Sequence, residues 1–145
     1  MVVKSTEYVY PVAQLAVVFL LKSPLMISSC LVSLTVATMM KLIIPELYDE
    51  LPGWAQRPTQ TAPGAGLECG FPSGHTALAT SFSYSLMIIS AGTNIFSISI
   101  ATLYSALIGL LRVYVGAHTI QQVTFGYIVG LLSFFYFYGI YTNPI

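Results

Sequence analysis

Residues 24–44 read PLMISSCLVSLTVATMMKLII, an apolar run in which Lys41 is the only charged residue. A helix needs roughly 20 apolar residues to cross a hydrocarbon core of about 30 Å. The run has this length, and a polar stretch follows it from Pro45 onward. It therefore predicts a transmembrane helix.

The composition of the whole chain also indicates a membrane protein. Of the 145 residues, 56% are hydrophobic and 7% are charged, and the mean hydropathy is +0.80. Soluble domains are about one quarter charged, so a soluble fold is excluded. Basic and acidic residues balance to a net charge of +0, which leaves no basic surface for nucleic acid. We expect Cys30, in the apolar run, and Cys69, in the polar stretch, to be free thiols.

Further apolar stretches extend this interpretation to the whole chain. The stretch 8–21 is short and contains Pro11 and Gln14, but its tyrosines suit a membrane interface, so we expect it to span. Because alternating strand patterns are missing, the sequence predicts a single all-α domain over 1–145, an integral-membrane bundle of about five transmembrane helices. The expected spans are 8–21, 24–44, 76–91, 95–111 and 123–141.

Small residues recur at every fourth position in three of these stretches. Such faces let helix backbones approach closely inside a membrane. We interpret the serines among them as packing residues rather than catalytic ones. The residues concerned are Ala77, Ser81 and Ser85; Ala101, Ser105 and Gly109; and Gly126 and Gly130.

The long polar stretch 45–74 contains four of the five acidic residues, five of the eight prolines and the only tryptophan. Loops of this length are commonly functional or disordered. Its mixture of apolar and acidic residues is typical of a segment at the water–lipid boundary, with Tyr48 and Trp54 as anchors. We therefore expect a polar interfacial loop here.

Four of the few polar side chains are candidates for chemistry: Arg57, His75, Arg112 and His118. If the helices cross alternately, the polar loop, the start of 76–91 and the end of 95–111 all lie at one membrane face. Charged groups near lipid are costly unless they have a function, and arginine matches phosphate oxygens well. The topology therefore predicts a phosphate site at this face.

The stretch before the third span, residues 71–76, reads FPSGHT. It suggests a turn followed by a helix with Ser73 as its N-cap. The N–H groups of Gly74 and His75 at such a helix start form an anion site.

The stretch between the last two spans suggests how a histidine could be held. Gly116 can break the chain, so that Arg112 and His118 both face the polar loop rather than opposite sides of one helix. Gln121 and Gln122 then lie about one turn beyond His118, and one of them could fix the imidazole tautomer.

A histidine held in this way can attack phosphorus and form a phosphohistidine. In such a scheme His118 is the nucleophile and His75 protonates the departing oxygen. Arg57 and Arg112 would stabilise the equatorial oxygens of the transition state.

These motifs resemble the type 2 phosphatidic acid phosphatase superfamily, which includes lipid phosphate phosphatases, polyprenyl pyrophosphate phosphatases and the soluble vanadium haloperoxidases. The family pattern is K-x6-R-P, then P-S-G-H, then S-R-x5-H-x3-D, and the resemblance covers roughly residues 41–135. It implies an enzyme that needs no metal and no cofactor. The implied catalytic positions are His118, His75 and Gln122, and the implied phosphate-binding residues are Arg57, Arg112, Ser73 and Gly74.

The chain departs from the family pattern at three positions. Glu50 stands where the family has lysine, Leu111 where it has serine, and Gln122 where it has aspartate. Glu50 replaces a phosphate-binding cation with an anion. Gln122 can accept a hydrogen bond from His118, but it cannot neutralise an imidazolium as a carboxylate does. The five expected spans are also one fewer than the six usual in the family's membrane enzymes.

The sequence thus predicts an integral, multi-pass membrane phosphatase that acts on a lipid phosphate or pyrophosphate through a phosphohistidine. The alternative is a catalytically degenerate member that serves as a structural or assembly protein of an envelope or virion, and a channel or carrier is a third class. The expected partners are the substrate lipid and membrane lipids, with no nucleic acid, and a homo-oligomer is left open. The distribution of lysine and arginine does not decide the side of the membrane on which the site lies.

Overall fold

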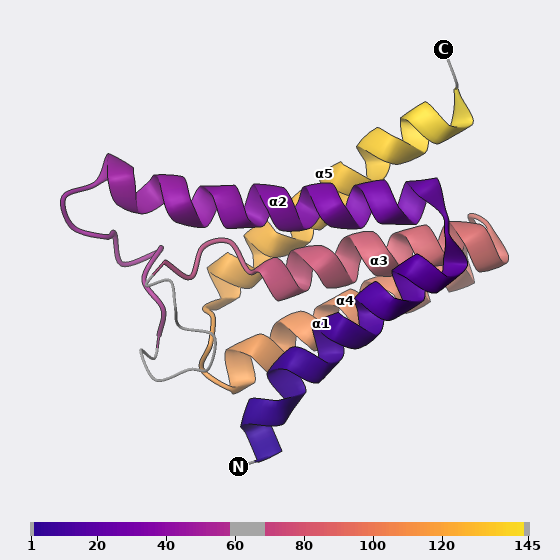
Figure 1. Ribbon diagram of the computed structural model, residues 1–145. Coiled ribbons are helices and arrows are strands. Elements are labelled where there is room, and N and C mark those ends of the chain that lie inside the picture. Colours follow the sequence, from indigo (N-terminus) through magenta and orange to yellow (C-terminus); the bar gives the residue numbers. More distant parts are fainter. Residues whose placement is uncertain (1, 59–68, 144–145) are drawn as a thin grey trace.

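The computed structural model describes residues 2–58 and 69–143, with side chains from residue 11 onward. Its five helices form a bundle (Figure 1). Within the described ranges they are joined by loops that contain one isolated bridge, between Gln56 and Cys69. The predicted all-α bundle is therefore confirmed. The helices are α1 (Val2–Leu21), α2 (Pro24–Leu47), α3 (Gly74–Ala91), α4 (Ile95–Tyr114) and α5 (Ile120–Thr142).

Polar caps fix where four of the helices begin. Ser23 accepts a hydrogen bond from the Met26 amide, and Pro24 occupies the first turn of α2, where its missing N–H costs nothing. Ser73 caps α3, Asn94 caps α4 and Thr119 caps α5, the last two in reciprocal capping boxes. These caps explain why α5 begins three residues before the predicted stretch 123–141.

Helix α3 lies at the centre of the bundle and contacts all four other helices. All its serines and threonines except Ser90 are buried, so the helix carries more buried hydroxyl groups than its neighbours although it is enclosed. By length and composition, the helices that could cross a membrane are α2, α4 and α5. Among the residues whose side chains the structure describes, Pro11–Leu21 is apolar but too short for that criterion, and 76–91 does not meet it. The expected spans 8–21 and 76–91 therefore stay predictions.

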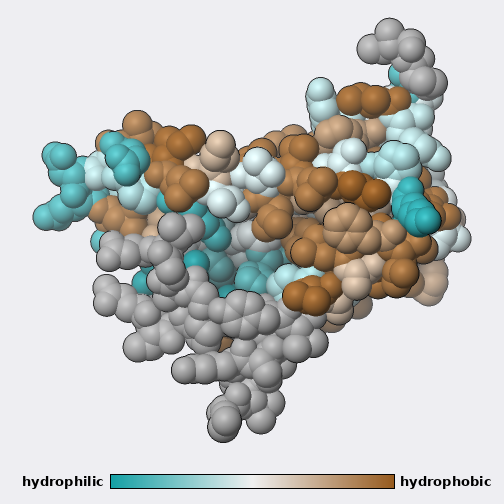
Figure 2. Space-filling model, viewed as in Figure 1, coloured by the Kyte–Doolittle hydropathy of each residue, from teal (hydrophilic) through white to brown (hydrophobic). Residues whose placement is uncertain are grey.

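The outer surface of the bundle is apolar over α2, α4 and α5. Large hydrophobic side chains such as Phe96 and Leu110 are well exposed there. The face shown in Figure 2 is mostly hydrophobic along the helices, whereas hydrophilic residues gather in a hollow at the end near the loop. This distribution suits a bundle whose helices face lipid.

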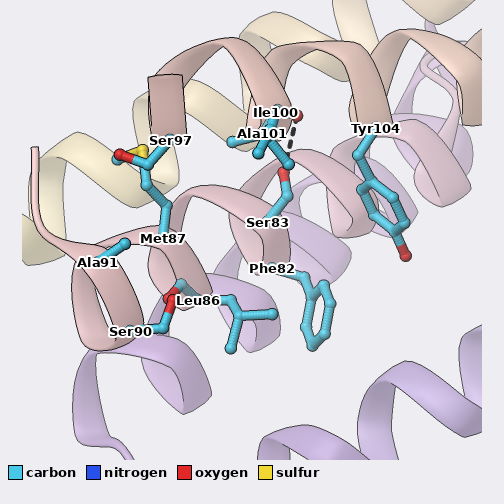
Figure 3. Close-up of a pocket in the computed structure, with 10 residues that line it drawn as sticks. All are labelled: Phe82, Ser83, Leu86, Met87, Ser90, Ala91, Ser97, Ile100, Ala101 and Tyr104. Carbon is cyan, nitrogen blue, oxygen red and sulfur yellow. Dashed lines mark hydrogen bonds between the residues drawn. The ribbon is translucent and has the colours of Figure 1, made fainter. Parts of the chain in front are cut away.

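Hydroxyl pairs join the central helix to its neighbours. Ser85 bonds Ser29 at 2.8 Å, and Ser81 bonds Ser33 at 2.9 Å, both across the α2–α3 contact. On the other side of α3, Ser83 bonds Ser105 of α4 at 3.0 Å and also donates to the carbonyl of Ala101 (Figure 3). The predicted packing role of Ser81, Ser85 and Ser105 is confirmed, since all three are buried between helices.

Glycines on α5 allow its backbone to touch α3. A Cβ atom on Gly126 would lie 2.4 Å from the carbonyl oxygen of Ser73, and one on Gly130 would lie 2.5 Å from that of Ala77. The backbones of α5 and α3 are therefore in direct contact, and the start of α5 lies beside the start of α3.

Candidate functional site

Four helix ends meet at one end of the bundle, as the topology predicts. Helix α2 ends there, α3 begins, α4 ends and α5 begins (Figure 1). The described parts of the polar loop, residues 48–58 and 69–73, cover the same end. The residues 59–68 of the expected loop 45–74 lie outside the described structure.

The turn between α4 and α5 folds His118 back onto Arg112. Arg112 lies in the last turn of α4, and its carbonyl accepts hydrogen bonds from the amides of Ala117 and His118 at 3.0 and 3.2 Å. Gly116 makes this turn possible with a φ of +70°, a conformation that costs a residue with a Cβ atom more. The predicted chain break at Gly116 is therefore confirmed, and it places two buried candidate residues side by side.

His118 is held by Gln122, which lies one turn into α5. The imidazole Nδ1 lies 3.1 Å from Gln122 Oε1. The opposite end of the same amide, Nε2, donates to the carbonyls of Trp54 and Gln56 at 3.1 and 2.7 Å, which identifies Oε1 as the acceptor toward the histidine. Nδ1 must therefore carry the proton, and the lone pair lies on Nε2.

Burial and positive charge keep this imidazole neutral. His118 is only 2% exposed. Desolvation, followed by the charges of Lys41, Arg57 and Arg112, lowers the pKa of His118 from 6.5 to about 3, and the hydrogen bond that His118 donates to Gln122 acts in the opposite direction. Three cations thus lie close enough to act on one histidine, and at neutral pH its Nε2 is an unprotonated base.

Lys41 is the residue that the sequence motifs did not identify. Its ammonium reaches the start of α3, where a Cβ atom on Gly74 would lie 3.6 Å from Lys41 Nζ. It comes from α2, which continues to Leu47 rather than ending at residue 44 as predicted. The sequence does contain a feature that could have identified it, because Lys41 is the only charged residue in its apolar run. An ionisable residue inside a membrane segment is a candidate functional residue.

The residues of the PSGH motif form the predicted helix start. Ser73 is fully buried, and its Oγ accepts hydrogen bonds from the amide and the hydroxyl of Thr76 at 3.4 and 3.0 Å. Gly74 begins α3, and His75 follows in its first turn with a half-buried side chain. The structure therefore assigns Ser73 the capping contact at the start of α3.

Arg57 follows a short loop segment that is bonded to the residues just before the PSGH motif. The amide of Gly70 donates to the carbonyl of Ala55 at 2.7 Å, and Gln56 bridges to Cys69. A Cβ atom on Gly70 would lie 3.0 Å from Arg57 Cγ, so the two segments of the loop pack closely. This packing gives Arg57 a fixed position relative to the start of α3.

The residues at the other two positions that depart from the family pattern are exposed rather than buried with His118. Glu50 is exposed in the bend after α2, and Leu111 is 51% exposed on the apolar outer surface of α4. A cation does lie in the cluster from a different position, since Lys41 Nζ is near Gly74 and its charge acts on His118. The expected free thiols, Cys30 and Cys69, are both free and buried.

Cavities elsewhere in the bundle do not contain these groups. A cavity of about 230 Å³ lies between α3 and α4 toward the opposite end, and Phe82, Leu86 and Tyr104 are among its lining residues (Figure 3). A second, of about 390 Å³, lies between α4 and α5 and is lined by apolar and hydroxyl-bearing residues in equal number. Charged side chains line neither cavity, so the candidate site is the cluster around His118.

Comparisons with known proteins identify the family of the chain. Residues 20–145 match the PAP2 superfamily, and this range includes Lys41 and every motif residue of the cluster but leaves out nearly all of α1. No curated protein and no solved structure gives a significant match. With the family matched over most of its length, and with apolar helices long enough to cross a bilayer, the chain is an integral membrane protein that belongs to the type 2 phosphatidic acid phosphatase (PAP2) superfamily, whose members are generally phosphatases.

Proposed function

We propose that this protein is a multi-pass membrane phosphatase that hydrolyses a lipid phosphate or pyrophosphate through a phosphohistidine at His118. The observation that carries the proposal is the state of this residue. Its Nδ1 proton is directed to Gln122, its Nε2 is unprotonated, and three cations surround it. This is the arrangement that a nucleophile needs for attack on a phosphate anion.

The first chemical step transfers the phosphoryl group to the histidine. The lone pair of His118 Nε2 forms a bond to phosphorus, and the bond from phosphorus to the leaving oxygen breaks. His75 donates its proton to that oxygen, so that the lipid departs as an alcohol or a lipid phosphate. Lys41, Arg57 and Arg112 stabilise the negative charge on the three equatorial oxygens.

The second step regenerates the histidine. Neutral His75, having lost its proton, removes a proton from water, and the water oxygen attacks the phosphohistidine. The P–N bond breaks, inorganic phosphate forms, and the electron pair returns to Nε2 of His118. The N–H groups at the start of α3, at Gly74 and His75, bind phosphate oxygens in both steps, and Ser73 fixes that helix start.

In this scheme Lys41 takes the part of the family's first-motif lysine. Its ammonium approaches Gly74 from α2, and its charge acts on His118. Because position 50 is a glutamate, a chain without Lys41 would bind the phosphate with Arg57 and Arg112 alone. Retention of three cations at a membrane face favours a functional site over a bundle kept only for its shape.

Phosphate release tests the proposal directly. The detergent-purified protein should release phosphate from phosphatidic acid or from a polyprenyl pyrophosphate in the presence of a metal chelator. His118→Ala should abolish release and leave the thermal unfolding curve with a clear cooperative transition. Orthovanadate, which mimics the pentacoordinate phosphoryl group, should inhibit the wild-type protein.

Two results would contradict the proposal. Release that persists in His118→Ala would exclude the phosphohistidine. A folded wild-type protein that neither releases phosphate nor binds vanadate would favour the structural or assembly role instead. Lys41→Met, which removes one of the three cations, should weaken both phosphate release and vanadate inhibition. Lys22→Met, which removes an exposed lysine just before the other end of α2, is its matched control in both assays.

A further inference from the structure

The side chain of Gln122 lies between the two halves of the candidate site. It is fully buried and takes part in four hydrogen bonds. Oε1 faces His118 Nδ1 at 3.1 Å and accepts from the amide of Thr119 at 3.2 Å. Nε2 donates to the carbonyls of Trp54 and Gln56, at 3.1 and 2.7 Å, and Gln56 directly precedes Arg57.

The two hydrogen bonds that Gln122 Nε2 donates require an amide at position 122. Both Nε2 hydrogens point to backbone carbonyl oxygens, which can only accept. A carboxylate at position 122 has no hydrogen to donate and would place a negative oxygen against two carbonyls. The aspartate of the family pattern could still orient the histidine, but it could not hold the segment that carries Arg57.

The backbone around Gln122 reinforces the same contact. The carbonyl oxygen of Gln122 accepts from the amide of Ser73 at 2.9 Å, so the helix start of the PSGH motif is bonded to the same residue. Gly70 packs directly on the amide, because a Cβ atom there would lie 2.7 Å from Gln122 Oε1. The segments that carry Arg57, Ser73 and His118 therefore all meet at Gln122.

We propose that Gln122 is a positioning residue that couples the placement of Arg57 to the orientation of His118, and that in this chain the amide is functional rather than a degenerate aspartate. The inference rests on the proposed function in that Arg57 and His118 act on the same phosphate. It predicts that substituting the family's aspartate at position 122 lowers activity, because the segment around Trp54 loses its attachment.

Trp54 provides a direct measurement of this attachment, since it is the only tryptophan in the chain. Its ring packs edge-to-face on Phe71 with the centroids 5.0 Å apart, and its carbonyl is bonded to Gln122. In Gln122→Asp and Gln122→Glu we expect a shifted Trp54 emission maximum and stronger quenching by acrylamide. Asn143→Asp makes the same change from amide to carboxylate at the exposed far end of α5, away from Trp54, and should leave both unchanged.

Kinetics separate this role from a purely structural one. Losing the Arg57 contact should raise KM, while disturbing His118 should lower kcat, so the Gln122 variants should change both and lose about 10- to 100-fold in kcat/KM. Gly70→Ala presses on the same amide without a change of charge, and it should shift Trp54 emission in the same direction. It serves as the second test if a Gln122 variant does not fold.

The proposal is overturned if Gln122→Asp keeps wild-type Trp54 emission, or if it equals the wild type in kcat/KM. Unchanged Trp54 emission in Gly70→Ala would also overturn it. The fluorescence result does not depend on catalysis. If the wild-type protein releases no phosphate while Trp54 responds as expected, the proposed function fails and the attachment by Gln122 stands.

Discussion

Gly126→Ala tests the close contact between α5 and α3 that holds the site together. The new methyl group would lie 2.4 Å from the carbonyl oxygen of Ser73, about 1 Å short of the 3.4 Å at which ordinary contact begins. Gly139 lies on the same helix with nothing within 4 Å of its Cβ position, so Gly139→Ala adds the same methyl group without a clash.

The two substitutions share one energy term and differ in another. Alanine is favoured over glycine in a helix by about 1 kcal/mol at both positions. Only Gly126→Ala adds overpacking, which costs about 1–3 kcal/mol, and the upper end applies because the obstacle is backbone rather than a flexible side chain. At about 2–4 °C per kcal/mol, the midpoints of the two variants should differ by roughly 6–12 °C.

Thermal unfolding of both variants in one detergent, followed by circular dichroism, measures this difference. We expect Gly139→Ala to match or exceed the wild-type Tm and Gly126→Ala to fall below it. Gly126→Ala should also lower phosphate release more than its Tm explains, because Ser73 caps the helix that begins at the phosphate site. Equal midpoints for the two variants would show that α5 does not touch α3 at Ser73, and the reasoning about the site's assembly would be wrong.

Three further predictions follow from the site and the bundle. Lys41→Met removes one of the charges that depress the pKa of His118, so that pKa, measured by NMR of labelled histidine, should rise, and Lys22→Met should leave it unchanged. Because the pKa of His118 is about 3 in the folded chain and near 6.5 when unfolded, the stability that depends on a neutral imidazole is complete above about pH 6.5. This stability should decline as the pH falls toward 3, and unfolding curves of His118→Gln should lack that slope. Ser83→Ala and Ser105→Ala should show a coupling of about 0.6 kcal/mol in a double-mutant cycle of unfolding, since their hydroxyls are 3.0 Å apart, and a coupling of zero would contradict the observed bond.

Much of the fold follows from local sequence patterns. The apolar stretches place all five helices, and the caps at Asn94 and Thr119 explain where two of them begin. The chain break at Gly116 and the packing of the small residues are also local features, and both are confirmed. The helix ends are predicted less accurately than the helices themselves. Helix α4 continues for three residues beyond the predicted residue 111, and α1 begins at Val2 rather than at residue 8.

The contacts of the site depend on residues far apart in the sequence. Gln122 bonds carbonyls 66 and 68 positions earlier, and no local pattern identifies such partners. Lys41 reaches Gly74 only because α2 packs against α3, so its spacing from Arg57 does not match the family motif. Side chains that act through tertiary contacts are therefore the part that sequence motifs miss.

The direction of the first helix has a practical consequence for experiments in intact membranes. Helix α1 begins at the same end of the bundle as the His118 cluster, whereas α5 ends at the opposite end (Figure 1). If the bundle crosses the membrane as proposed, we expect a label or protease site placed before α1 to be exposed to the compartment that the phosphate site faces. We expect one placed after α5 to be exposed to the other compartment. Accessibility of these two positions in sealed vesicles would identify the compartment from which the substrate headgroup is drawn.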